Sequence, residues 1–159
     1  MLKSTVRVSA ILLASTLTPF AFAAHTHMAT PSTWTLNLAE SDFGGGPSMK
    51  SDVFVITMDT EKWAKWSDNM VDSDGKTWKF SWSGPADGTL KPFTGMPGFY
   101  STNAATDVSV ESTPDGSTFT CTFSLSADKK KFTNKCVTKT KDGKQFNQTV
   151  VYDHTKIGG

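Results

Sequence analysis

The chain has 159 residues, of which 37% are hydrophobic, and its 16 Lys and Arg nearly balance its 15 Asp and Glu. A chain of this length and composition is sufficient for one globular domain with its own core. The net charge is near zero, whereas nucleic-acid binding requires strong positive charge, so we expect no nucleic-acid partner.

The N-terminus has the three-part pattern of a signal peptide. Its positive start contains Lys3 and Arg7, its apolar centre spans 8–17, and its end, Ala-Phe-Ala, fits the small-x-small rule for cleavage. We therefore expect residues 1–23 to be removed on export to the periplasm or the outside, leaving a single domain at 24–159. An uncleaved N-terminal anchor is the alternative. No later run is apolar enough to cross a membrane, so we expect no integral membrane segment in the mature chain.

Removal of that segment would also remove Arg7, which is the only arginine of the chain. Arginine is the usual side chain for planar, bidentate recognition of a carboxylate or phosphate. An acidic ligand would therefore be held by lysines, hydroxyl groups or backbone NH groups.

Alternation of apolar and polar residues predicts strands with one apolar face along most of the mature chain. In chain order we expect strands at 33–38, 51–58, 76–83, 107–112, 118–126, 131–140 and 145–153. A loop rich in Gly and Pro at 41–47 separates the first two, because it cannot continue a ladder. The region 84–98 is also loop-rich, with room for a short edge strand at 90–94.

One segment, 61–68, is ambiguous. Trp63 and Trp66 are three residues apart, which suits one face of a helix but opposite faces of a strand. The sequence leaves both conformations open.

Four turn sequences divide the second half of the chain. They are Asp74-Gly75-Lys76, Asp115-Gly116-Ser117, Asp128-Lys129-Lys130 and Asp142-Gly143-Lys144. Asp and Gly tolerate the positive φ of tight hairpin turns, and repeated hairpins without a helical pattern indicate an antiparallel meander. We therefore expect an all-β, up-and-down barrel of about eight to ten strands, with a β-sandwich as the alternative.

Short motifs follow one another in an order found in a known group of proteins. A first strand with a Trp at 33–37 precedes Phe-Gly-Gly-Gly-Pro at 43–47. Phe-Ser-Trp-Ser-Gly at 80–84 and Pro-Phe-Thr-Gly-Met-Pro-Gly at 92–98 come next, and Val-Val-Tyr-Asp at 150–153 closes the chain. In this order the chain resembles small exported lipocalin-like proteins of bacteria and, more distantly, the lipocalins and fatty-acid-binding proteins of the calycin group. The resemblance implies an up-and-down barrel with an internal apolar cavity.

Two features of these families are missing. Lipocalins usually have Gly-x-Trp in the first strand and an Arg packed across that Trp, whereas Ser32-Thr33-Trp34 keeps only the Trp. Fatty-acid-binding proteins hold the ligand carboxylate with Arg-x-Tyr on the last strand, whereas here Val150 stands two residues before Tyr152. We therefore do not expect a carboxylate clamp of that type.

Cys121 and Cys136 are the only cysteines. If the turn at 128–129 is the centre of a hairpin, Leu125 faces Phe132 and the two cysteines face each other. Their Cα atoms would then lie about 4.5 Å apart, within the reach of a disulfide. In an exported chain we expect this bond to form, closing a loop of about 15 residues, with two free buried thiols as the alternative.

Few residues suit catalysis or metal binding. His25 and His27 lie beside the new N-terminus, where they would bind Cu(II) with the terminal amine or form a polar tail, and we favour the tail. His154 is near the C-terminus, where we expect it to be exposed. The Asp-rich turn at 72–75 lacks carboxylates at the first and twelfth positions of a calcium loop. We expect no catalytic residue, metal, cofactor or enzymatic activity.

Lysines gather on the last predicted hairpins, where they either block strand edges as solvated charge or form a basic portal. They are Lys129, Lys130, Lys131, Lys135, Lys139, Lys141 and Lys144.

Aromatic residues form the candidate binding site. Trp78, Phe80 and Trp82 share one strand face, which inside a barrel is core or cavity wall and outside would be a flat platform for sugars. We expect a lipocalin-like protein that binds a small apolar or amphipathic ligand, with Lys or hydroxyl groups at the mouth. The alternative is a carbohydrate- or protein-binding surface module with no internal ligand. The candidate cavity-lining residues are Trp34, Trp78, Phe80, Trp82, Phe119, Phe123 and Tyr152.

Overall fold

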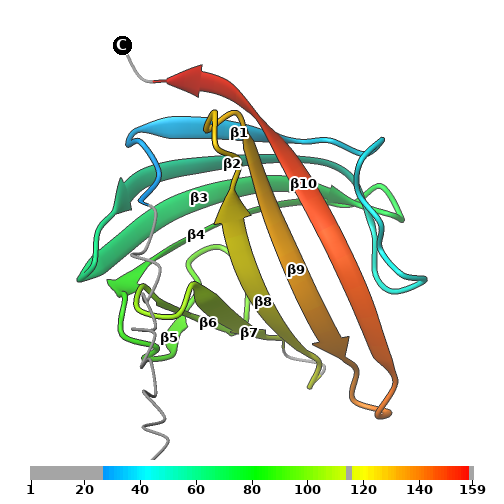
Figure 1. Ribbon diagram of the computed structural model, residues 1–159. Coiled ribbons are helices and arrows are strands. Elements are labelled where there is room, and N and C mark those ends of the chain that lie inside the picture. Colours follow the sequence, from blue (N-terminus) through cyan, green and yellow to red (C-terminus); the bar gives the residue numbers. More distant parts are fainter. Residues whose placement is uncertain (1–26, 114–115, 158–159) are drawn as a thin grey trace, which may run out of the picture.

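The computed structural model describes residues 27–113 and 116–157, which form ten antiparallel strands (Figure 1). In chain order the strands are β1 (Ser32–Leu36), β2 (Met49–Asp59), β3 (Trp63–Asp72), β4 (Thr77–Pro85), β5 (Lys91–Pro92), β6 (Phe99–Asn103), β7 (Val108–Ser112), β8 (Thr118–Leu125), β9 (Lys131–Lys139) and β10 (Gln145–Ile157). In the described part of the chain there is no helix of the length and apolarity needed to cross a membrane. The expected signal peptide, its cleavage site and His25 lie outside the described residues.

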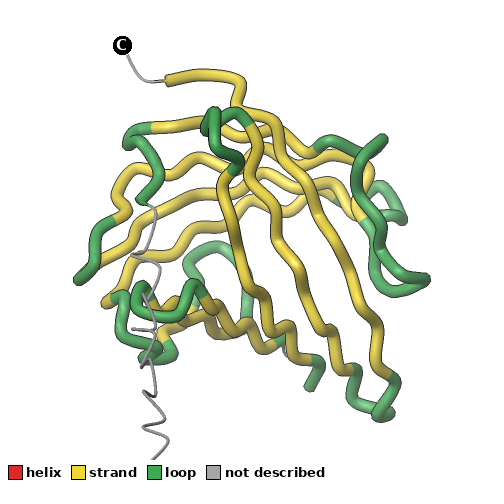
Figure 2. The backbone as a smooth tube through the Cα atoms, in the orientation of Figure 1, coloured by secondary structure: helices red, strands yellow, loops and turns green. Residues whose placement is uncertain are grey.

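All ten strands belong to one sheet with the order β4-β3-β2-β1-β10-β9-β8-β7-β6-β5. Strands adjacent in the chain are paired, except for β4 and β5, which are the two edges of the sheet. The first and last strands, β1 and β10, also pair with each other. Strand β4 meets the segment after β5 through a bridge between Ser81 and Thr94, whose two backbone hydrogen bonds measure 2.8 and 2.9 Å. The sheet therefore curls into a nearly closed barrel, with β1–β4 as one wall and β8–β10 as the facing wall (Figure 2).

This architecture confirms the predicted all-β, up-and-down barrel, and the ambiguous segment 61–68 belongs to a strand. Trp63 points outward and is 44% exposed, whereas Trp66 points inward and is 6% exposed. Residues three apart on a strand face opposite sides of the sheet, and a core on only one side separates the two tryptophans.

The strand predictions missed β6 and the end of β10. Strand β6 follows a stretch rich in Gly and Pro, and its Ser, Thr and Asn residues carry no apolar alternation. It forms because Tyr100 pairs with Glu111 on β7 and Pro92 of β5 pairs with Phe99. Strand β10 continues to Ile157 because β1 supplies backbone partners beyond the predicted end at residue 153.

The predicted turns contain residues with positive φ, as tight hairpin turns require. Gly75 and Gly143 have φ values of 88° and 83°, and Lys129 also lies in the left-handed region, at 56°. Gly116 has φ of 85° in the third turn, whose Asp115 lies outside the described residues.

Trp34 is buried in the part of the wall where β1 pairs with β10. It is 2% exposed, and its indole Nε1 donates a hydrogen bond to Ser32 Oγ at 2.9 Å. His154, which pairs with Trp34 across β1 and β10, packs against the indole with ring centroids 4.6 Å apart. The expectation that His154 is exposed is therefore wrong: it is half-buried, because the last strand is longer than predicted.

The β8–β9 hairpin has the predicted register. Leu125 pairs with Phe132 and Cys121 with Cys136, and the two cysteines form a disulfide with Cα atoms 4.0 Å apart. Disulfides persist in oxidising compartments, so this bond indicates an oxidising environment for the folded chain.

Candidate ligand cavity

A cavity of about 640 Å³ lies inside the barrel. Inward-facing residues of β2, β3 and β4 line one side, and those of β6 to β10 line the other. Side chains alternate along each strand, so one face of every strand points inward. The inward faces place Phe, Trp, Tyr and Met side chains around this space.

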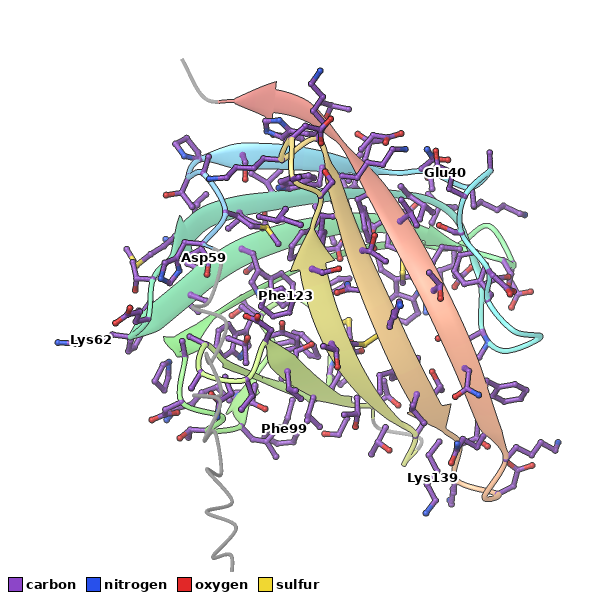
Figure 3. The ribbon with its side chains drawn as sticks, viewed as in Figure 1. Glu40, Asp59, Lys62, Phe99, Phe123 and Lys139 are labelled. Atoms are coloured by element: carbon purple, nitrogen blue, oxygen red, sulfur yellow. A yellow bond between two sulfur atoms is a disulfide. The ribbon has the colours of Figure 1, made fainter. Side chains whose placement is uncertain are left out.

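Five of the seven predicted lining residues lie on the cavity wall, namely Trp78, Phe80, Phe119, Phe123 and Tyr152. Phe123 projects from β8 into the space between the two walls (Figure 3). The other two, Trp34 and Trp82, do not line the cavity, because neighbouring side chains cover them in the packed core. Ligand binding by these residues stays a prediction.

Trp82 is core because its indole lies over Gly84, two residues ahead on the same face of β4. It is 1% exposed, and a Cβ atom added at Gly84 would come within 2.5 Å of the Trp82 ring. The stripe of Trp78, Phe80 and Trp82 faces the barrel interior, so it does not form an external platform.

Trp66 was missed as a wall residue because the segment 61–68 had no assigned conformation. Its ring centroid lies 5.1 Å from that of Phe54, 5.0 Å from Tyr100 and 5.9 Å from Phe80. These four aromatic side chains come from β2, β3, β4 and β6, and all of them line the cavity. Strand alternation would have placed Trp66 inward had the strand been recognised.

The β1–β2 connection covers part of the cavity. Phe43 and Pro47 line it, and the Gln148 side-chain amide donates hydrogen bonds to their carbonyl oxygens at 3.3 and 2.8 Å. Gly44 has φ of 58°, and a Cβ atom there would overlap the carbonyl oxygen of Asn147. The Gly run of the Phe-Gly-Gly-Gly-Pro motif therefore lets this loop pack directly on β10.

Two aspartates lie side by side on the inner face of β2 and β3. Asp68 pairs with Phe54, and Asp52, two residues before Phe54 on the same face, is its diagonal neighbour. Asp52 is 1% exposed, and its Oδ2 accepts a hydrogen bond from the Tyr152 hydroxyl at 2.7 Å. Neither aspartate was among the predicted site residues, although Asp52 lies on the same strand face as the apolar Phe54 and Ile56.

Burial raises the pKa of Asp68 well above its usual range, and the hydrogen bond and negative charge of Asp52 raise it further. Two adjacent carboxylates in an apolar wall cannot both ionise easily, because each charge lacks water and repels the other. Asp68 therefore carries a proton at neutral pH and donates it in a hydrogen bond to Asp52.

Glu111 adds a third carboxyl group from β7. Burial raises its pKa from 4.5 to about 7. Tyr100, which pairs with Glu111, is also buried, and this raises the pKa of its hydroxyl to about 12. Burial and the nearby Asp52 and Asp68 raise the pKa of Tyr152 well above 10, so both tyrosines stay neutral.

Asp59 and Asp72 line the cavity at the two ends of the β2–β3 pair. The Asp59 carboxylate accepts a hydrogen bond from the Met28 backbone NH at 2.7 Å and lies at the end of β2 (Figure 3). The Asp72 carboxylate accepts one from the Trp78 indole at 2.8 Å, which lowers the pKa of Asp72. The described residues that line the cavity include no Lys, Arg or His.

No lysine belongs to the described cavity wall, and the expected Lys or hydroxyl groups at the mouth stay a prediction. Lys131 instead pairs with Glu40 and Asp153 on the outer surface, and Lys144 pairs with Asp142. Lys139 points away from the barrel (Figure 3). The ionisable side chains of the described cavity wall are acidic or tyrosine, and Ser and Thr hydroxyl groups also line it.

Across residues 27–113 and 116–157, no three His, Cys, Asp or Glu side chains come together as metal ligands. His27, described at the N-terminal side, has its Nδ1 atom 3.8 Å from Asp59 Oδ1.

No model of a protein family matches the chain, and no curated protein is significantly similar to it.

Proposed function

We propose that the protein is an exported, lipocalin-like binding protein that takes a small apolar or amphipathic ligand into its barrel. The observation that carries the proposal is the cavity of about 640 Å³ with its aromatic wall. Sites for small organic ligands typically have volumes of about 300–1,000 Å³ and combine apolar walls with a few polar groups.

The driving force would be burial of apolar ligand surface, at roughly 25 cal/mol per Å². Hydrogen-bonded strands form the cavity wall, and the Cys121–Cys136 disulfide lies within it. A preformed wall favours binding, because little conformational entropy is lost when the ligand enters.

The lipocalin-like part of the proposal is supported by Trp34 on the first strand. The ring of His154 packs against this Trp, in the role that the lipocalins give to an Arg. The clamp of fatty-acid-binding proteins has no equivalent, because the Tyr152 hydroxyl donates its hydrogen bond to Asp52.

The export part of the proposal is supported by the signal-like sequence at 1–23 and by the disulfide. Protein recovered from the periplasm or medium of a bacterial host should begin at Ala24 by intact-mass measurement. A mass that retains Met1 would contradict cleavage and would favour the N-terminal anchor.

A neutral apolar dye tests the binding function. We expect its fluorescence to rise saturably when it enters the cavity and to fall when an apolar competitor displaces it. Trp78→Ala should weaken dye binding several-fold, because Trp78 lines the cavity. Trp63→Ala is the matched control, because Trp63 is exposed on the outer face of β3.

Two outcomes would contradict this function. Without saturable binding of any apolar probe, the surface-module alternative would be favoured, and glycan arrays or partner capture would test it. Equal effects of Trp78→Ala and Trp63→Ala would place the dye outside the cavity.

A further inference from the structure

The carboxyl groups of the cavity have no basic partner in its wall. Asp52, Asp68 and Glu111 all line the cavity, and none of the described residues around them there is Lys, Arg or His. Buried acidic groups in folded proteins are normally paired with a cation or fully hydrogen-bonded. A purely apolar ligand would not require three buried carboxyl groups in one cavity.

Polar atoms beside these carboxyl groups also lack partners within the described chain. Trp66 is 6% exposed, and its buried Nε1–H has no hydrogen-bond acceptor there. Asp52 Oδ1 and Asp68 Oδ1 are also buried, and the described residues offer them no hydrogen-bond donor besides the protonated Asp68 carboxyl itself. Buried polar atoms are satisfied in the great majority of cases, so these atoms indicate that the site is completed by a polar ligand.

Aromatic rings surround the same place. Asp68 pairs with Phe54 on β2 and with Phe80 on β4, and both rings contact Trp66. Tyr100 closes this group, with its ring centroid 5.0 Å from that of Trp66. Aromatic faces attract cations through their quadrupole, most strongly where water is excluded.

Carboxyl groups and aromatic faces together suit an organic cation. A metal ion is disfavoured, because the described carboxyl groups do not converge as metal ligands. A ligand carboxylate is disfavoured, because the negative field of the wall would repel it.

We propose that the cavity binds an amphipathic ammonium ligand, an alkylamine or arylalkylamine, whose ammonium group lies beside Asp52, Asp68 and Glu111 and whose apolar part packs on the aromatic wall. This inference rests on the proposed binding function and names the ligand class for the same site.

Proton release accompanies this binding. Asp68 and Glu111 have raised pKa values, so they hold protons that an incoming ammonium ion displaces. The ionisable groups that face them are Asp52 from β2, Tyr152 from β10 and Tyr100 from β6, and none of these is basic. Affinity for the ammonium ion therefore increases as the pH rises through about 7, where Glu111 ionises, and increases further at higher pH, where Asp68 ionises.

Three compounds with one alkyl chain test the ligand class. Octylammonium, 1-octanol and octanoate are titrated into the mature protein by calorimetry near pH 7.5. We expect octylammonium to bind at least tenfold more tightly than 1-octanol, and octanoate to bind most weakly. The ammonium ion alone should release protons, seen as a dependence of the binding heat on the ionisation enthalpy of the buffer.

Amide variants test the residues. Asp68→Asn should weaken octylammonium binding at least tenfold more than it weakens 1-octanol binding. Glu111→Gln is the second variant and should lower the affinity in the same direction, so the test does not depend on one folded mutant. Asp74→Asn, in the exposed β3–β4 turn, is the matched control and should change neither affinity.

The outcomes separate the two proposals. If 1-octanol and octylammonium bind equally, or if both amide variants bind octylammonium as the wild type does, the ammonium class is overturned while the binding function stands. If none of the three compounds binds, both proposals are overturned.

Discussion

Glu111 links the folding of the barrel to proton binding. Burial raises its pKa from 4.5 to about 7 in the folded protein. Between these pH values the folded state holds a proton that the unfolded chain has released, so the free energy of unfolding decreases as the pH rises. Above that window Glu111 is ionised in both states and adds no further slope. Asp68 acts in the same direction, because its pKa is also raised.

We expect Glu111→Gln to remove this contribution, which is at most about 3.5 kcal/mol because one pKa unit corresponds to about 1.4 kcal/mol. Urea unfolding near pH 5 and pH 8 should show that the wild type loses more stability than the variant over this range. Glu61→Gln, in the exposed β2–β3 turn, is the matched control and should keep the wild-type slope. Equal slopes for Glu111→Gln and wild type would show that Glu111 is ionised in the folded protein throughout.

At the scale of the element, the β8–β9 hairpin is cross-linked within the cavity wall. Its disulfide joins residues 15 apart in sequence. A cross-link of this length stabilises the fold by about 3 kcal/mol in the loop-entropy model, because it restricts the unfolded chain.

The double variant Cys121→Ala/Cys136→Ala should therefore unfold in urea with a free energy about 3 kcal/mol lower than that of the oxidised wild type. Titration of unreduced, denatured wild type should detect essentially no free thiol. Two thiols per chain would show that the bond does not form in the host compartment. A loss of stability below about 1 kcal/mol would show that the unfolded chain is already restricted without the bond.

At the scale of the whole molecule, the barrel closes through isolated bridges, and not through a strand ladder, where β4 meets the segment after β5. Bridges join Ser81 to Thr94 and, just beyond β4, Asp87 to Asn103. Gly95 follows Thr94 with φ of 95°, and a Cβ atom there would lie 2.5 Å from the carbonyl oxygen of Lys79. A side chain at this position would push the segment away from β4.

We expect Gly95→Ala to destabilise the closure and to speed hydrogen exchange at the Ser81 and Thr94 amides, while the β8–β9 amides keep their protection. Gly45→Ala is the matched control, because Gly45 also has positive φ, at 75°, but a Cβ atom there would meet nothing within 4 Å. Both variants have the backbone strain of a non-Gly residue at positive φ, and only Gly95→Ala adds the clash. Equal destabilisation would show that the close approach to Lys79 does not limit the closure.

Local patterns along the chain were sufficient to predict the barrel. Alternation identified most strands, and the turn at 128–129 set the register that joins Cys121 to Cys136. These features depend on residues close in sequence, because side-chain alternation has a period of two and a tight turn sets the pairing of the strands that it joins. The same alternation also placed five of the seven predicted aromatic residues on the cavity wall.

These local patterns did not predict the acidic character of the cavity. Tyr152 and Asp52 are 100 residues apart in sequence, and they meet only because β1 pairs with both β2 and β10. Asp68 comes to the wall from a segment with no clear local preference, and Glu111 comes from the far side of the barrel. Alternation determines which face of a strand a residue occupies, but curling of the sheet determines which faces meet. Tertiary structure alone therefore brought the three carboxyls into one cavity, since burial and proximity depend on strands that are distant in the chain.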